Sequence, residues 1–151
     1  MNDEIQKTNP PEIICINRCI IKNPSEPKAL IIKRVLNDSY NPGLWEFPGG
    51  KLDAGQDVGH TLEREILEET GLLINPISRL VYFDSYVIGK GKNIGKTLIE
   101  LYGIADLTGG ILKLSKEHDD YAWKTYKEAL GYELTLSTRE ALITLGRTAL
   151  N

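Results

Sequence analysis

The chain has 151 residues, of which 41% are hydrophobic and 26% are charged. This length and composition are typical of a globular domain that buries a core without disulfides or structural metal, and we expect one domain over residues 1–151. The formal net charge of −3 argues against the strongly basic surface with which proteins bind a nucleic-acid polymer.

The first twelve residues contain acids and no apolar segment of the signal-peptide type. No apolar run in the chain is long enough to span a bilayer. We therefore expect a cytoplasmic protein that does not contact a membrane.

Two apolar runs follow, and each predicts a strand. Residues 12–22 are rich in isoleucine, and after a turn residues 29–35 are expected to pair back on them. Cys15 and Cys19 lie four residues apart in the first run, which at about 3.3 Å per residue is too far for a disulfide between them. We expect buried, reduced thiols, because the sequence has no second His/Cys cluster to complete a metal site.

A helix is predicted over residues 57–70. This run contains no proline and ends at Gly71, which can adopt a positive φ without strain. Within it Val58, Leu62 and Ile66 recur every four residues and form one apolar stripe for a core.

Glu65, Glu68 and Glu69 share another face of this helix because they stand at i, i+3 and i+4. Like charges at this spacing repel, and acids near a helix C-terminus also face the unfavourable end of the dipole. Arg64 reaches Glu68 but leaves two carboxylates uncompensated. Clustered carboxylates are the ligands that Mg²⁺ prefers, although a solvated acidic face has the same pattern.

After the helix, residues 77–88 and 97–107 predict two long strands joined by the loop 89–96. The loop ends in Gly-Lys-Thr, like a phosphate-binding loop. That motif needs glycine where Lys90 stands, and it needs a helix where this chain has a strand pattern. We therefore predict a basic hairpin tip, whose lysines can still reach a substrate phosphate.

The C-terminal part predicts a polar loop over residues 115–120, a short strand over 121–125 and an amphipathic helix over 137–150. Ser137 and Glu140 have the spacing of a capping box at the start of that helix. The simplest layering of all these elements is a mixed sheet with at least two helices packed on it.

The stretch from Gly50 to Leu72 resembles the signature of the Nudix hydrolases, Gly-x5-Glu-x7-Arg-Glu-aliphatic-x-Glu-Glu-x-Gly-aliphatic. The matching positions are Gly50, Arg64, Glu65, Ile66, Glu68, Glu69, Gly71 and Leu72. Because six of them require one residue type each, a chance match in one register has a probability on the order of 10⁻⁷. The one departure is Gln56, which replaces a glutamate of the family and keeps hydrogen-bonding capacity without the charge.

The resemblance implies an α/β fold, the Nudix α/β/α sandwich with a central mixed sheet. It also implies hydrolysis of a pyrophosphate bond in a nucleoside diphosphate linked to another group X, with Mg²⁺, or alternatively Mn²⁺, as the ion. Glu65 and Glu69 would be the main metal ligands, Glu68 a further ligand or base, and the Gly50 carbonyl another ligand. Arg64 would hold the glutamates in place.

Further site residues follow from the same resemblance. Glu117 lies in a segment that looks like the loop supplying another catalytic acid near the metals, or else it is a solvated loop acid. His118 can titrate near neutral pH, but we expect it at the surface. The approach to the signature resembles that of MutT-type enzymes, so Trp45 or Phe47 would stack on a base or pack into the core, and Lys51 would contact the substrate.

The substrate class is narrowed by two absences. Residues 87–88 lack the proline typical of the ADP-ribose branch, and residues 89–90 lack the tyrosine of the dinucleoside-polyphosphate branch. We therefore expect a monomer or homodimer that hydrolyses a nucleoside triphosphate to the monophosphate and pyrophosphate. The alternatives are a non-catalytic Nudix module that binds a nucleotide or protein, which Gln56 favours, and an acidic helix without ligand.

Overall fold

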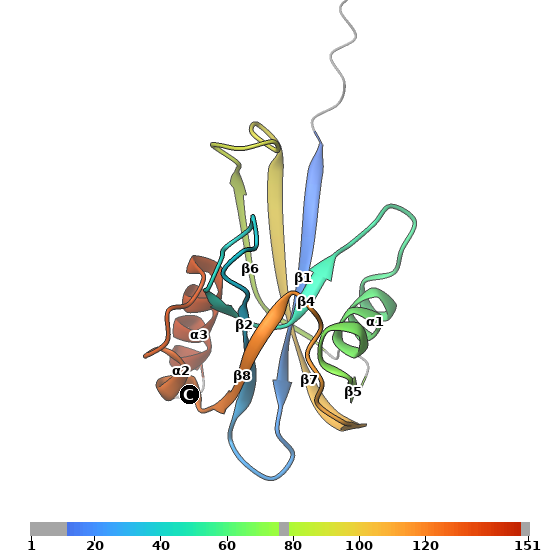
Figure 1. Cartoon of the computed structure of the whole chain (residues 1–151), viewed down its shortest axis with the longest axis vertical. Coiled ribbons are helices and arrows are strands. Elements are labelled where there is room, and N and C mark those ends of the chain that lie inside the picture. Colours follow the sequence, from blue (N-terminus) through green and yellow to red (C-terminus); the bar gives the residue numbers. More distant parts are fainter. Residues whose placement is uncertain (1–11, 76–78, 149–151) are drawn as a thin grey trace, which may run out of the picture.

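The computed structural model of the chain describes residues 12–75 and 79–148 (Figure 1). Its elements follow one another in the order β1 (Ile13–Lys22), β2 (Ala29–Arg34), β3 (Trp45–Glu46), β4 (Gly49–Lys51), α1 (Val58–Thr70), β5 (Leu72–Ile74), β6 (Arg79–Val87), β7 (Thr97–Gly110), β8 (His118–Lys124), α2 (Tyr126–Ala129) and α3 (Leu136–Thr148). In Figure 1, α1 lies on one side of the sheet, and α2 and α3 lie on the other. This layering is the predicted α/β/α sandwich.

The sheet is organised around β1. On one side β1 runs parallel to β7, from Ile13 opposite Thr97 to Lys22 opposite Asp106. On its other side it pairs antiparallel with β4 and, at one end, with β2. β3 and β8 extend the sheet from β2, and β5 and β6 extend it from β7. Residues 89–96 join the antiparallel pair β6 and β7, which confirms the predicted hairpin and excludes a phosphate-binding loop.

Two apolar cores lie on the two faces of the sheet because successive strand residues point in opposite directions. The α3 face buries Ile20, Ile31, Phe47, Tyr102, Ala141, Leu142 and Leu145. The α1 face buries Cys19, Ile21, Leu30, Ile32, Leu62, Ile66 and Ala105. Burial of a side chain such as Leu62 or Ile66 contributes about 1.5–3 kcal/mol, so the predicted apolar stripe holds α1 firmly against the sheet.

α1 ends where the sequence predicts and begins one residue later, at Val58. Asp57 is its N-cap, and the carboxylate accepts a hydrogen bond from the backbone N–H of His60 at 2.9 Å. Gly71 follows the last turn with φ 72° and donates its N–H to the Leu67 carbonyl. A Cβ at Gly71 would lie 2.3 Å from the carbonyl oxygen of Ile111, so both conformation and packing require glycine here.

Two predictions near the C-terminus are corrected. β8 begins at His118, so the second half of the predicted loop 115–120 is a strand, paired with β2 through His118 opposite Arg34. α3 begins at Leu136 rather than Ser137, and it is capped by Thr135, whose Oγ1 accepts from the backbone N–H of Thr138 at 3.3 Å.

The sequence patterns did not predict the short elements β4, β5 and α2. The expectations for residues 1–11, 77–78 and 149–150 lie outside the described residues. No helix in the described part of the chain combines the length and the apolar character needed to cross a membrane.

Candidate active site

Two glutamates of α1 meet the glycine pair of β4. Glu69 is buried, and its Oε2 accepts a hydrogen bond from the backbone N–H of Gly49 at 2.9 Å. Glu65 is half-buried and lies against Gly50, where a Cβ would come within 2.6 Å of the Glu65 carboxyl carbon. Glu68 is exposed. The glycine pair therefore allows two carboxylates to approach the backbone closely.

Arg64 lies beside two of these glutamates. Its Nη2 is 3.2 Å from Oε1 of Glu65, and its Nε is 3.8 Å from Oε1 of Glu68. The Arg64 side chain is 45% exposed, so these ion pairs add little to stability and serve mainly to orient the carboxylates. Neither pair includes Glu69.

The electrostatics of the cluster favour a bound cation. Burial raises the pKa of Glu69 to about 8, although the Gly49 N–H and Arg18 act in the opposite direction. The pKa of Glu65 is also raised, first by burial and then by neighbouring Glu68. A divalent cation would replace the proton and match the oxygen donors, so these residues fit such an ion.

The segment before β8 brings Glu117 to the same place. Ligand atoms of Glu69, Glu117 and His118 all lie within 4.8 Å of one another. The backbone N–H of Ser115 donates to the Glu69 carbonyl at 3.0 Å, which ties the segment to the end of α1. The exposed Glu117 is also close enough for its charge to raise the pKa of Glu65. The sequence left this proximity open.

His118 is buried, so the expectation of a surface histidine is wrong. Its side chain is 0% exposed, and Nε2 lies 3.1 Å from Oε1 of Glu46. The expectation failed because the polar run around His118 suggested a loop, whereas pairing with β2 makes His118 the first residue of β8. A backward extension of the predicted strand 121–125 would have included it.

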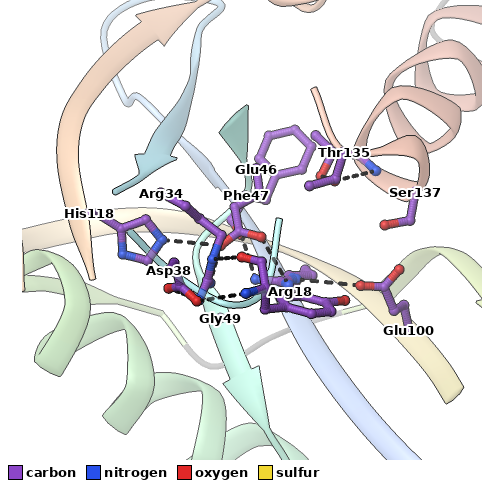
Figure 2. A network of polar contacts seen from close by, with 12 residues as sticks. Arg18, Arg34, Asp38, Glu46, Phe47, Gly49, Glu100, His118, Thr135 and Ser137 are labelled. Carbon is purple, nitrogen blue, oxygen red and sulfur yellow. Dashed lines mark hydrogen bonds and ion pairs between the residues drawn. The ribbon is translucent and has the colours of Figure 1, made fainter. Parts of the chain in front are cut away.

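Glu46 is the centre of a buried polar network that the sequence analysis missed. Arg18 Nη2 is 3.1 Å from Oε2 of Glu46, and Arg34 Nη1 is 2.9 Å from Oε1. Figure 2 shows both guanidinium groups and the His118 ring converging on this carboxylate. Burial by itself would raise the pKa of Glu46, but Arg18, His118 and Arg34 together lower it to about 2. The carboxylate therefore stays charged inside the protein.

The family is decided by comparison with known proteins. The sequence model of the NUDIX domain matches residues 17–144. The chain belongs to the NUDIX family. Nucleoside triphosphatase NudI of Escherichia coli O139:H28 is 31% identical over 122 residues, which cover 75% of this chain and 84% of that relative. The chain is thus a Nudix hydrolase, as its signature predicts.

Solved structures agree on the Nudix fold. The E. coli ORF135 protein matches with a TM-score of 0.76 and 24% identity, over 91% of each chain. The MutT protein of Methanosarcina mazei Go1 matches with a TM-score of 0.75 and 24% identity, over 93% of this chain and 98% of that chain. These similarities confirm the α/β/α sandwich.

Gln56, the departure from the Nudix signature, has a structural place in the loop before α1. Its Oε1 accepts from Oγ1 of Thr61 and from the backbone N–H of Asp53, each at 3.3 Å. These bonds tie the loop to the first turn of α1. The amide thus retains hydrogen bonding without adding charge to the site.

The residues expected to bind substrate have different surroundings. Phe47 is fully buried, and its ring packs edge-to-face against Tyr102 with centroids 6.2 Å apart. Phe47 therefore packs into the core, and the alternative that it stacks on a base is wrong. Trp45 is half-buried against Tyr132, with ring centroids 4.8 Å apart. Lys51 is exposed at the end of β4. Contacts of Trp45 and Lys51 with substrate remain predictions.

Proposed function

We propose that this Nudix hydrolase cleaves a pyrophosphate bond in a nucleoside triphosphate and releases the monophosphate and pyrophosphate, with Mg²⁺ as the ion. The proposal rests on the position of Glu117. The segment before β8 brings Glu117 close to Glu65 and Glu69 of α1, so the three carboxylates form one acidic site. The substrate class is supported by the relative named as a nucleoside triphosphatase.

In this proposal Glu65 and Glu69 hold the cation. Both carboxylates lie against the β4 backbone, and both have raised pKa values, so a positive ion next to them would stabilise their charged forms. The Gly50 carbonyl is a further ligand. Arg64 orients Glu65 and Glu68 through its two contacts. When bound, the divalent cation neutralises charge on phosphate oxygens and makes a water molecule more acidic.

Glu117 and Glu68 are the candidates for a further ligand or a general base. Both are exposed, so water and substrate can reach their carboxylates. The ammonium group of Lys51 would neutralise phosphate charge next to the site, and Trp45 would contact the base. In this proposal the exposed Glu117 or Glu68 accepts a proton from water, and the buried Glu69 binds the cation.

The test is a hydrolysis screen of the purified chain with Mg²⁺ over nucleoside triphosphates, nucleotide sugars, ADP-ribose and dinucleoside polyphosphates. We expect monophosphate and pyrophosphate from at least one triphosphate, loss of activity on chelation, and a loss of about 100-fold or more in Glu69→Gln. Glu63→Gln is the matched control because Glu63 lies about 200° around the same helix from Glu65.

Release of orthophosphate and a diphosphate, or activity that persists in Glu69→Gln, would contradict the proposal. Nucleotide binding without turnover of any compound in the screen would identify the natural protein as a binding module. In that case Gln56→Glu, which restores the signature, is the variant that should create activity.

A further inference from the structure

The two ring nitrogens of His118 have different surroundings. Nε2 lies 3.1 Å from Oε1 of Glu46, and the side chain is 0% exposed. Nδ1 is buried and has no hydrogen-bond partner among the described residues. A buried polar atom without a partner costs free energy, and a ligand bound to this nitrogen would remove that cost.

Glu46 determines which nitrogen of the neutral ring holds the proton. Its carboxylate is contacted by Arg18 at 3.1 Å and by Arg34 at 2.9 Å, which keeps it ionised and able only to accept hydrogen bonds. The proton of the neutral imidazole must therefore reside on Nε2. Nδ1 is left with a free electron pair, the form in which histidine binds metals.

The ring of His118 lies beside two carboxylates. A ligand atom of His118 lies within 4.8 Å of carboxylate oxygens of Glu69 and Glu117, which are themselves within that distance of each other. Atoms bound to one ion at about 2.0–2.2 Å lie at most about 4.4 Å apart. The three distances therefore exceed this limit by at most about 0.4 Å, which small side-chain movements are sufficient to close.

We propose that Nδ1 of His118 is a nitrogen ligand of the divalent cation held by Glu65 and Glu69, on the side of the site where Glu117 lies. The inference rests on the metal site of the proposed function and adds a donor that the signature glutamates do not supply. Glu46 would accept a hydrogen bond from Nε2–H of the bound ring, because metal-bound histidines commonly donate their other N–H to a carboxylate.

The proposal changes the expected ion preference. Mg²⁺ and Mn²⁺ both bind oxygen ligands, but a nitrogen donor favours first-row transition ions over Mg²⁺. A carboxylate site with one added imidazole should therefore bind Mn²⁺ more tightly than Mg²⁺. A histidine that only supports the fold through Glu46 would not produce this preference.

The direct test is pulsed electron paramagnetic resonance of the full chain loaded with one equivalent of Mn²⁺ and no nucleotide. We expect a coupling to ¹⁴N of a bound imidazole, which ¹⁵N-labelling of histidine should replace by a ¹⁵N coupling. The chain has two histidines, and His60 is 87% exposed beside Asp57. The coupling should therefore persist in His60→Gln and disappear in His118→Gln, which keeps an N–H donor for Glu46.

Calorimetric titration supplies a second measurement. His118→Gln should weaken Mn²⁺ binding by at least about 10-fold and Mg²⁺ binding by less. Failure to bind Mn²⁺, absence of a nitrogen coupling in the bound wild type, or a coupling that survives His118→Gln would overturn the proposal. Hydrolysis without nitrogen coupling would refute only His118 ligation, and nitrogen coupling without hydrolysis of any triphosphate would refute only the proposed function.

Discussion

The metal-free protein should lose stability as the pH rises, and Glu69→Gln should remove most of that loss. Burial places the pKa of Glu69 at about 8 in the folded chain, against its ordinary value of 4.5. The folded state therefore holds this proton more tightly than the unfolded state. The resulting contribution to stability is complete below pH 4.5 and is lost as the pH rises towards 8.

Between pH 5 and pH 8.5 this linkage amounts to at most about 4 kcal/mol, which corresponds to roughly 10 °C in Tm for a domain of this size. Glutamine has no proton to lose, and its amide oxygen can still accept from the Gly49 N–H that now bonds Glu69. The variant should thus have its largest advantage over the wild type at pH 8.5. The pKa of Glu65 is also raised, so Glu65 adds a loss of stability with rising pH to the wild type and to the variant alike.

Urea unfolding followed by circular dichroism, in the presence of a chelator at pH 5, 6.5 and 8.5, measures the effect. Glu63→Gln is the control for removal of one carboxylate from α1 and should follow the wild type. Added Mg²⁺ should restore the wild type at pH 8.5 and have little effect on Glu69→Gln. Parallel pH profiles for wild type and Glu69→Gln, or a variant less stable than wild type at pH 8.5, would refute the reasoning.

Three further variants test the site. Glu117→Gln should lower kcat by about 100-fold or more, and a change within about threefold would remove Glu117 from catalysis. Gln56→Glu should lower the Mg²⁺ concentration for half-maximal rate by no more than about 10-fold, because Gln56 contacts Thr61 at the start of α1; identical titration curves would show that the residue is neutral to metal binding. Gly50→Ala should lower kcat/KM by about 100-fold in a folded protein, since the new Cβ would displace the Glu65 carboxyl group, and wild-type rates would contradict this.

The sequence alone determined the helix and the face that its glutamates share. A rotation of about 100° per residue brings Glu65, Glu68 and Glu69 together whatever the helix packs against. The end of the helix at Gly71 is equally local, because its N–H bonds to the Leu67 carbonyl one turn earlier. These interactions act between neighbours along the chain, and their prediction was correct for that reason.

Pairing between distant segments overrode local preference elsewhere. The polar residues at the start of β8 have low strand propensity, yet their pairing with β2 makes them a strand and turns His118 inward. Phe47 likewise lies in the core because β1, β7 and α3 meet around it. Neither position is set by the residues that flank it.

Only the tertiary structure decided which charges from different segments lie together. Glu117 and His118 reach Glu69 because β8 pairs with β2 while the segment before it bonds to the end of α1. Glu46 stays ionised in the interior because Arg18 and Arg34, from two other strands, contact its carboxylate. Desolvation and Coulomb energies depend on distance and burial in space, whereas the sequence pattern specifies only neighbours along one helix or strand.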